Sequence, residues 1–201
     1  MFQSYEYLFP LVIGYLIGSV PFGLIITRAA GLGDIRKIGS GNIGATNVLR
    51  TGQKFLAVFT LFFDILKGSA PVLLFSANSN LEFGLVAGAS AVFGHNFPIW
   101  LKFKGGKGVA TTIGIYLAAF WPVGIATCVA WMLVAVTFRY SSLAALVSLS
   151  LPPLYFCWLE KYGALWIPLI LVALSFFRHS GNIKRLATGK EPKLFPKKDY
   201  E

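Results

Sequence analysis

The stretch that decides the fold runs from residue 109 to residue 138 and reads VATTIGIYLAAFWPVGIATCVAWMLVAVTF. It contains no Asp, Glu, Lys or Arg, and the pair Trp121-Pro122 divides it. Because proline lacks a backbone N–H and clashes with the preceding helical turn, the stretch is either one kinked helix or a hairpin of two short helices. The choice sets whether the chain has six or seven apolar helices, and therefore where its cationic end lies.

The composition of the chain indicates a membrane protein. Apolar residues make up 56% of 201 residues, charged residues only 13%, and the mean hydropathy is +0.68, whereas a soluble domain has about a quarter charged residues. Such a chain cannot cover itself with a polar surface, so we expect one all-α integral membrane domain spanning residues 1–201. Cys128 and Cys157 lie in apolar runs and indicate neither a disulfide framework nor a metal site.

The apolar runs predict the membrane spans. With the hairpin reading, seven runs are found, at residues 8–27, 55–77, 81–100, 109–121, 123–138, 143–159 and 164–177. Several are shorter than the ~20 residues that cross a hydrocarbon core of ~30 Å. Such short spans are held within the helix bundle or matched by local thinning of the bilayer.

The distribution of cations favours seven spans. With the N-terminus outside, one face of the membrane receives 16 of the 18 Lys and Arg residues, while Lys161 lies on the other face and Lys67 inside a span. The 16 are Arg28, Arg36, Lys37, Arg50, Lys54, Lys102, Lys104, Lys107, Arg139, Arg178, Lys184, Arg185, Lys190, Lys193, Lys197 and Lys198. Six spans would place the cationic C-terminus outside, against the positive-inside rule. We therefore expect a cytoplasmic C-terminus, short loop helices at the inner face, and anionic partners there rather than nucleic acid.

Three Gly-rich, cation-rich segments fall on this same face. We call them the first loop (residues 39–50), the second loop (residues 94–108) and the third loop (residues 178–185). Each combines backbone freedom, small hydrogen-bonding side chains and fixed positive charge. Together they predict a pocket for phosphate groups at the membrane surface.

The first loop contains the pattern G-x-G-x-x-G, but no strand precedes it, so the dinucleotide reading is weak. A glycine turn leading into a short helix at residues 45–50 fits better, with backbone N–H groups forming an anion-binding nest. An ordinary polar turn that caps a helix is the equally weighted alternative. The candidate phosphate ligands are Ser40, Gly41, Asn42, Gly44, Thr46, Asn47 and, as a bidentate donor, Arg50.

The second loop ends in Lys104-Gly105-Gly106-Lys107-Gly108. It has the ingredients of a P-loop without its spacing, and it opens a helix, where the dipole favours an anion. Lys107 is the better ligand candidate because it lies between glycines at the helix start, whereas Lys102 fits a membrane anchor. His95 has either a structural or a direct role, and the structural one is favoured.

The third loop places Arg178 and His179 at the membrane boundary and Asn182 three residues further on. On a continuing helix this spacing puts His179 and Asn182 on one face. The alternative is a polybasic stretch that binds anionic lipid, which is the role expected for residues 190–198. The turn at residues 139–142 adds Ser142 on the same side.

Asp64 and Lys67 lie inside the second span, three residues apart. Charges inside a membrane invite a functional interpretation, but these two can pair with each other, and we favour a structural pair. The sequence shows no nucleophile elbow, zinc spacing, close acid pair or His-x-x-x-x-Asp pattern. Direct covalent or metal chemistry is therefore not indicated.

At these residues the chain resembles a known family. The three loops are similar to the signature loops of the bacterial acyl-phosphate:glycerol-3-phosphate acyltransferase family (PlsY type), and the run from Phe63 to Gly68 resembles it as well. The likeness extends in order from Ser19 to Gly189; the tail beyond is less characteristic.

The resemblance implies transfer of a fatty acyl group from acyl phosphate to the sn-1 hydroxyl of glycerol 3-phosphate, giving lysophosphatidic acid and phosphate. This is the first acylation step in phospholipid synthesis. The implied location is the bacterial cytoplasmic (inner) membrane, with the active site facing the cytoplasm. The implied partners are the two substrates, membrane lipids and the enzyme that supplies acyl phosphate, with no cofactor and no metal.

For that reaction we expect His179, Asn182 and Lys107 to be catalytic. His179 and Asn182 orient glycerol 3-phosphate, and Lys107 offsets charge on the leaving phosphate. Lys104, Gly105, Gly106, Ser142, Arg178 and His95 complete the set of expected substrate contacts. Either His179 or a substrate phosphate takes the hydroxyl proton, and the sequence leaves both open. The rivals are an anion transporter and a non-enzymatic lipid-binding scaffold.

Overall fold

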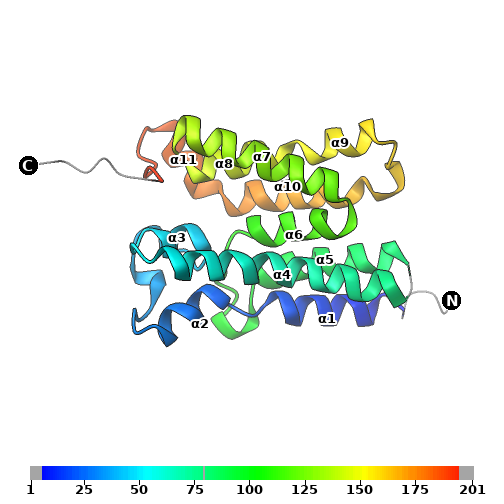
Figure 1. Cartoon of the computed structure of the whole chain (residues 1–201), viewed down its shortest axis with the longest axis horizontal. Helices are drawn as coiled ribbons and strands as arrows, with labels where there is room; N and C mark the ends of the chain where they lie inside the picture. Colours follow the sequence, from blue (N-terminus) through cyan, green and yellow to red (C-terminus); the bar gives the residue numbers. More distant parts are fainter. Residues whose placement is uncertain (1–5, 79, 195–201) are drawn as a thin grey trace, which may run out of the picture.

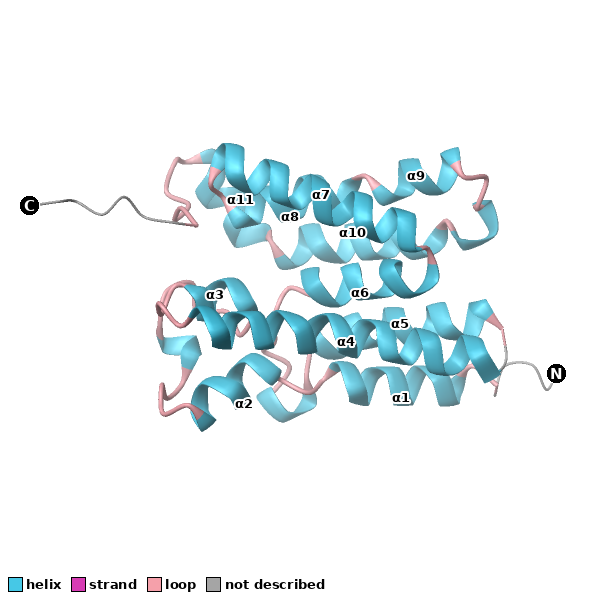
Figure 2. Ribbon diagram, in the orientation of Figure 1, coloured by secondary structure: helices cyan, strands magenta, loops and turns pink. Residues whose placement is uncertain are grey.

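The computed structural model describes residues 6–78 and 80–194 and is helical, with no strand among them (Figures 1 and 2). The main helices are α1 (Leu8–Gly18), α2 (Phe22–Ala29), α4 (Lys54–Asn78), α5 (Leu81–Asn96), α6 (Val109–Ala119), α7 (Trp121–Phe138), α8 (Ser141–Ser150), α9 (Pro152–Trp158), α10 (Trp166–Arg178) and α11 (Ser180–Ala187). Shorter helices are α3 (Ala45–Leu49), η1 (Ile35–Lys37), η2 (Ile99–Leu101) and η3 (Tyr162–Ala164). Every apolar run expected from the sequence is thus helical.

Proline breaks the helix in two of the expected spans, although Leu8–Ala29 and Ser141–Trp158 each remain one candidate membrane span. The run at residues 8–27 is not one helix but α1 and α2, separated at Pro21, and the run at residues 143–159 is α8 and α9, separated at Pro152. The missing N–H of proline explains both breaks, since Pro21 is the N-cap of α2 and Pro152 is the first residue of α9, and neither continues the preceding helix. The run at residues 81–100 also ends early, at Asn96, where the second loop begins.

The stretch at residues 109–138 is a hairpin. Helix α6 ends at Ala119, Phe120 is non-helical, and α7 starts with Pro122 in its first turn. Helices α6 and α7 pack against each other, α6 also packs on α4, and α7 packs on α8. The reversal at residue 120 therefore joins two groups of helices, one containing α1, α2, α4 and α5 and the other containing α7 to α11 (Figure 1).

Small residues let the helices approach closely in the first group. A Cβ added to Gly14 of α1 would lie 2.1 Å from the carbonyl oxygen of Ala87 on α5, and one added to Gly18 would lie 2.0 Å from that of Ala91. Two glycines four residues apart thus form the contact face, as they do in closely packed membrane helices. Substituting either glycine would force α1 away from α5.

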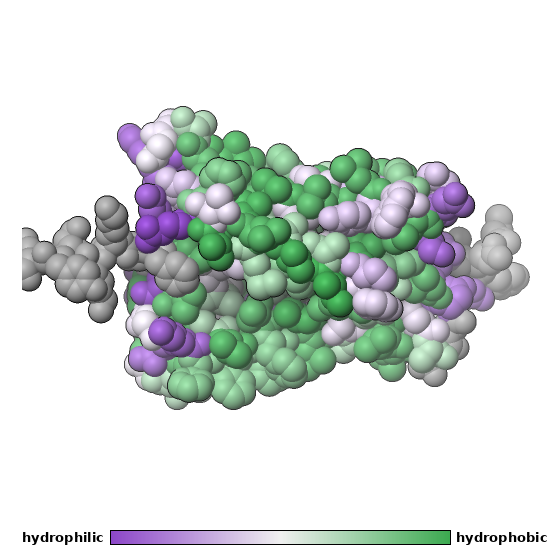
Figure 3. Space-filling model, turned by 45° about the horizontal axis from the view of Figure 1, so that its top comes forward, coloured by the Kyte–Doolittle hydropathy of each residue, from purple (hydrophilic) through white to green (hydrophobic). Residues whose placement is uncertain are grey.

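The lateral surface of the molecule is apolar. Figure 3 shows a broad apolar band between two polar ends, and large side chains such as Phe55 (83% exposed) and Val136 (79%) point outward from it. Among the described residues, four helical segments are long and apolar enough to cross a bilayer, and the bent pair formed by Tyr162–Arg178 and Ser180–Ala187 adds a fifth. The chain is therefore a multi-span membrane protein, while the count of seven and the orientation stay predictions.

The helices differ in length, and this sets the depth of the loops. Helix α4 has 25 residues, α5 has 16 and α6 has 11, which corresponds to about 37, 24 and 16 Å at ~1.5 Å per residue. The end of the bundle opposite the N-terminus carries α2, α3 and α11 (Figure 1). Because α5 and α6 are short, the second loop between them lies nearer the middle of the bundle than this end does (Figure 1).

Candidate functional site

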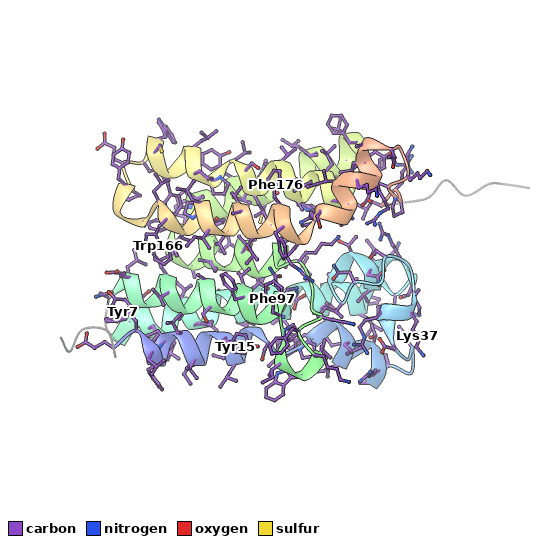
Figure 4. All side chains as sticks on the ribbon, turned by 180° about the vertical axis from the view of Figure 1, so that it is seen from behind. Tyr7, Tyr15, Lys37, Phe97, Trp166 and Phe176 are labelled. Atoms are coloured by element: carbon purple, nitrogen blue, oxygen red, sulfur yellow. The ribbon has the colours of Figure 1, made fainter. Side chains whose placement is uncertain are left out.

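The three loops converge on one pocket. A cavity of about 510 Å³, which we call the outer pocket, is lined by residues from the first-loop region, the second loop and the third loop. Its lining residues are Asp34, Arg36, Lys37, Gly41, Phe103, Lys104, Gly105 and Arg178. Figure 4 shows Lys37 near the end of the bundle and Phe97, which Arg178 overlies, near its middle. The predicted convergence of Gly41, Lys104, Gly105 and Arg178 is therefore seen, whereas Asp34, Arg36, Lys37 and Phe103 were missed.

An acidic residue fixes part of the outer-pocket wall. Asp34 caps η1 and accepts hydrogen bonds from Arg36 Nε at 2.9 Å and from Arg36 Nη2 at 2.5 Å. Arg28 Nη2 lies 3.3 Å away. The hydrogen bonds from Arg36 hold the pKa of the Asp34 carboxyl well below its usual range, so Asp34 is charged and anchors Arg36 at the pocket. In the sequence, the only sign of this contact is that a single Asp stands two residues before an Arg.

The first loop is held together by Asn47. The Oδ1 atom of this buried residue accepts from the backbone N–H of Ser40 at 2.8 Å, and its Nδ2 lies 3.0, 3.0 and 2.7 Å from the carbonyl oxygens of Ile35, Ile38 and Asn42. Asn47 thus has an internal structural role, and its contact with a phosphate stays a prediction.

Some backbone N–H groups of the first loop are also engaged within it. The N–H of Gly41 donates to Ile38 and that of Gly44 to the Asn42 side chain. Positive φ at Gly39 (+58°) and Gly41 (+70°) makes these turns, which is a requirement that glycine meets without strain. Part of the expected nest is therefore closed by the loop's own acceptors, and its binding of a phosphate stays a prediction. Helix α3 spans only Ala45–Leu49. Thr46 is half-buried at its first turn.

The second loop is tied to Arg178. The Nε and Nη2 atoms of this guanidinium donate to the carbonyl oxygens of Gly106 and Gly105, both at 3.0 Å. Its carbon Cζ lies 5.1 Å from the ring centroid of Phe97, a cation–π distance. Gly108, with φ of +76°, then caps α6, so Lys107 lies at the helix start as predicted.

Lys107 belongs to a second cationic centre. Its Nζ donates to Asn182 Oδ1 at 2.5 Å, joining the second loop to the third. Burial lowers the pKa of Lys107 to about 8, and the nearby Arg185, Arg50 and Arg178 act in the same direction. We call the group Lys107, Ser142, Asn182, Arg185 and Glu191 the inner cluster.

Glu191 is the residue of the inner cluster that the sequence did not indicate. Its Oε1 accepts from Ser142 Oγ and Asn182 Nδ2, both at 2.6 Å, and its Oε2 accepts from Arg185 Nε at 2.8 Å. Burial works against its charge, but these hydrogen bonds outweigh burial and keep the pKa of the carboxyl below its usual value. A single acid among tail lysines has no spacing pattern that could have revealed it.

The tail therefore does more than bind lipid, which corrects our expectation for residues 190–194. The N–H of Leu194 donates to the carbonyl oxygen of Arg139 at 2.7 Å, and its side chain packs with Ala135 and Ala144. Lys197 and Lys198 lie outside the described residues. Arg50 Nη2 contacts the carbonyl oxygen of Pro192 at 3.4 Å, while its buried Nε has no hydrogen-bond partner within the described structure.

The third loop does not continue the helix before it. The continuing helix that would place His179 and Asn182 on one face is therefore not formed. Helix α10 ends at Arg178, α11 begins at Ser180, and the two are bent by 62° at His179. His179 and Asn182 are nevertheless both buried on the inward side, next to the second loop. His179 Nδ1 is 2.8 Å from the carbonyl oxygen of Ser175. Burial and the charge of Lys107 lower the pKa of His179 to about 4.

The expected ion pair inside the bundle is confirmed. Lys67 Nζ lies 2.8 Å from Asp64 Oδ1, and both side chains are buried. His95 is also buried, beside Asp64 and against Gly106, rather than at the outer pocket. Ser40 is exposed at the rim of the first loop, apart from the inner cluster.

An apolar groove lies on the side of the bundle. Its volume is about 440 Å³ and it is lined by Tyr7, Leu11, Val86, Ala89, Ser90, Phe93, Trp166 and Ile170 of α1, α5, α10 and the residue preceding α1. The rings of Phe93, which lines the groove, and Phe97 are tilted, with centroids 6.4 Å apart, and Phe97 contacts Arg178 of the outer pocket. Figure 4 shows Tyr7 and Trp166 toward the opposite end of the bundle.

Comparison with known proteins gives one consistent family. The family model described as glycerol-3-phosphate acyltransferase matches residues 8–189. A glycerol-3-phosphate acyltransferase of Rhodospirillum rubrum is 55% identical over 193 residues, covering 92% of this chain and 89% of its own length. One of Paramagnetospirillum magneticum is 56% identical over 191 residues, covering 94% of each chain.

Solved structures agree with the sequence relatives. A crystal structure of PlsY, an integral membrane glycerol 3-phosphate acyltransferase, in its glycerol 3-phosphate form has a TM-score of 0.88 and 35% identity, covering 95% of this chain and 96% of that one. Its lysophosphatidic acid form has a TM-score of 0.86 and 34% identity, covering 94% and 95%. The similarity therefore includes nearly the whole fold.

Proposed function

The chain belongs to the glycerol-3-phosphate acyltransferase family, and we propose that it transfers a fatty acyl group from acyl phosphate to the sn-1 hydroxyl of glycerol 3-phosphate at the cytoplasmic face of the bacterial inner membrane. One observation carries this proposal above the others. Two cationic centres, the outer pocket and the inner cluster, meet at the second loop. A reaction between two phosphate-bearing substrates requires such a pair of centres.

We assign the acyl phosphate head group to the outer pocket. Arg36, Lys104 and Arg178 line that pocket, and their charges suit a dianion. The contacts from Arg178 through Phe97 to Phe93 lead from the pocket to the apolar groove. The groove then gives the acyl chain an apolar place beside the bilayer.

Glycerol 3-phosphate fits the inner cluster. His179 and Asn182 orient it, Ser142 supplies a hydroxyl, and Arg50 has an unpaired buried nitrogen for its phosphate. Lys107 is bonded to Asn182 and neighbours Arg178, so it lies between the two centres. From there its ammonium group can offset charge on the phosphate that leaves.

The transfer is a direct displacement. The sn-1 hydroxyl oxygen forms a bond to the acyl carbonyl carbon, the bond from that carbon to the phosphate oxygen breaks, and phosphate leaves with the electron pair. Acyl phosphate is already activated, so positioning and charge stabilisation supply the catalysis without a covalent enzyme intermediate. A trapped acyl-enzyme adduct or ping-pong kinetics would contradict this step.

Two groups can accept the hydroxyl proton. The Nδ1 of His179 can donate to the Ser175 carbonyl oxygen, which leaves Nε2 unprotonated and able to act as base. The substrate phosphate, with a second pKa of ~6, is the alternative. Since a base works best when its pKa is near the operating pH, the pH profile separates the two.

The donor and the activity are tested together. Purified protein is supplied with glycerol 3-phosphate and, in separate reactions, acyl phosphate, acyl-CoA or acyl-carrier protein, and lysophosphatidic acid is measured. We expect product with acyl phosphate alone. Product only from a thioester would contradict the donor, and no product from any donor would favour a transporter or a scaffold.

The orientation is tested by cysteine labelling. Single cysteines at Thr51, Lys102 and Lys190 should react only with membrane-permeant reagents in intact cells, because the proposed orientation places the three loops and the tail on the cytoplasmic side. Gly105 is unsuitable, since a side chain there would lie 2.1 Å from the His95 carbonyl oxygen. Labelling of any of the three from outside would contradict a single cytoplasmic site.

A further inference from the structure

A polar cluster lies beneath the second loop, inside the apolar part of the bundle. Asp64 and Lys67 of α4 and His95 of α5 are each at most 4% exposed. Lys67 Nζ is 2.8 Å from Asp64 Oδ1 and donates to the carbonyl oxygen of Val20 at 3.0 Å. The same Asp64 oxygen is 3.7 Å from His95 Nδ1. Charged groups at such depth are costly, so their placement under a substrate loop calls for a reason.

His95 contacts that loop directly. A Cβ added to Gly106 would lie only 2.0 Å from His95 Nε2 and 2.8 Å from its Cδ2. The imidazole therefore packs on the bare Cα of Gly106. The backbone N–H of Gly106 also donates to the His95 carbonyl oxygen at 3.0 Å. The position of the ring thus sets how deep the loop lies.

The loop passes this constraint to the outer pocket. Arg178 donates to the carbonyl oxygens of Gly105 and Gly106, and Arg178, Gly105 and Lys104 line the pocket. A shift of the loop would therefore change the orientation of the Arg178 guanidinium and move the Lys104 ammonium group. On the other side, Lys67 binds Val20 at the break between α1 and α2, which leads toward the first loop.

We propose that Asp64 and His95 are positioning residues for acyl transfer, an inference that rests on the proposed function. The imidazole of His95 supports the Gly105–Gly106 segment. The carboxylate of Asp64, paired with Lys67, lies 3.7 Å from the imidazole Nδ1, an electrostatic contact longer than a hydrogen bond. The carboxylate beside Nδ1 favours a hydrogen on that nitrogen, which turns the Nε2 lone pair toward Gly106. Neither residue touches the substrates; both act through the loop and Arg178.

A double-variant experiment tests the support by His95. Gly106→Ala places a methyl group where the ring lies, and overpacking of this kind should lower kcat/KM at least about tenfold. Adding His95→Ser removes the ring and should restore kcat/KM at least about threefold relative to Gly106→Ala. Thermal unfolding midpoints of the substrate-free variants in detergent are measured alongside.

Gly105→Ala is the matched control. Its added methyl would meet the His95 carbonyl oxygen at 2.1 Å and Pro98 Cδ at 2.4 Å, so shortening the His95 side chain frees no room for it. His95→Ser should therefore leave Gly105→Ala as impaired as before. If His95→Ser restored kcat/KM equally in Gly105→Ala and Gly106→Ala, the proposal would be overturned, because the recovery would not come from removing the contact between the imidazole ring and Gly106.

The outcomes separate this inference from the proposed function. If the wild-type protein makes no lysophosphatidic acid, the proposed function fails, while coupling of the thermal midpoints at positions 95 and 106 still reports the contact. No recovery of either midpoint or kcat/KM in His95→Ser/Gly106→Ala overturns the support by His95. If the double variant recovers the thermal midpoint but not kcat/KM, the contact between His95 and Gly106 serves packing alone, and the positioning role is overturned.

Asp64 is tested by removing both charges together. The pair Asp64→Asn and Lys67→Met avoids leaving one buried charge alone, so the midpoint should stay near that of the wild type. We expect kcat/KM to fall while lysophosphatidic acid is still formed. Wild-type kinetics in this folded variant would remove Asp64 from the proposal.

Discussion

Lys104 and Lys107 lie three residues apart in one glycine-rich loop, yet their surroundings are opposite. Lys104 is exposed and lines the outer pocket with Arg36 and Lys37. Lys107 is half-buried, hydrogen-bonded to Asn182 and surrounded by Arg50, Arg178 and Arg185. The outer pocket is an open cationic wall, whereas the inner cluster is a closed hydrogen-bonded network. Residues of one type in one motif thus differ in their surroundings because they differ in depth.

The largest effect is expected in the inner cluster. Lys107→Ala removes a charge-assisted hydrogen bond and leaves Asn182 Oδ1 without its donor, which should cost about 1.5–3 kcal/mol, or about ten- to a hundredfold in kcat/KM. Lys54→Ala, at an exposed cation of the same end, should be nearly silent. Initial rates of lysophosphatidic acid formation measure both. Equal rates in the two variants would show that Lys107 is a membrane anchor like Lys54 and not a substrate ligand.

The pH profile of kcat/KM sharpens the contrast. Since the pKa of Lys107 is lowered to about 8, its ammonium group is lost as pH rises through that value, and kcat/KM should fall above it. On the acidic side, a limb near pH 4 that disappears in His179→Ala identifies His179 as the base, whereas a limb near ~6 that persists identifies the substrate phosphate.

Glu191 tests whether the inner cluster needs its acid. Glu191→Gln keeps the size of the side chain but loses its charge and one acceptor for Arg185, Ser142 or Asn182. We expect the free energy of unfolding to fall by about 1–3 kcal/mol, with a lower kcat because Asn182 and Lys107 lose their alignment. Denaturation and kinetics on the same preparation measure this; a wild-type kcat with wild-type stability would remove Glu191 from the account.

The smallest effect is expected in the apolar groove, far from both centres. Ile170→Trp fills a groove position that is exposed to lipid, so acyl chains long enough to reach it should be transferred less well than short ones. The loss should be smaller than that of Lys107→Ala, because displaced methylenes move into lipid rather than into water. Leu169→Trp, on the neighbouring exposed position outside the groove, is the matched control. The same chain-length preference in both variants and the wild type would place the acyl chain elsewhere.

The sequence predicted the helices and the shared face of the three loops because both depend on regular signals. Apolar runs gave the helices, and the one-sided distribution of cations placed Lys104, Lys107 and Arg178 together. Depth was not readable in this way. From the sequence, Asn47 looks like a phosphate ligand, because it is a polar residue in a Gly-rich, cation-rich loop. In the structure its side chain instead accepts a hydrogen bond from Ser40, seven residues earlier, and so holds the loop closed.

Other features depended on contacts that have no local pattern. Asp34 and Glu191 are lone acids in basic segments, and each becomes informative only when folding brings its arginine or amide partners around it. The bend at His179 was missed because nothing in the residues from Arg178 to Ser180 breaks a helix by itself. It comes from the packing of α11 against α8 and α10, which keeps His179 and Asn182 inside.

The central claim is that two phosphate centres meet at one loop, and steady-state kinetics with both substrates varied tests it most directly. Lys104→Ala should raise the KM for acyl phosphate several-fold while leaving that for glycerol 3-phosphate unchanged, because it removes one exposed charge from the outer pocket. Lys107→Ala should lower kcat, because its ammonium group serves the leaving phosphate between the centres. If both variants raised the same KM by the same factor with kcat unchanged, the outer pocket and the inner cluster would be one binding site, and the account would be wrong.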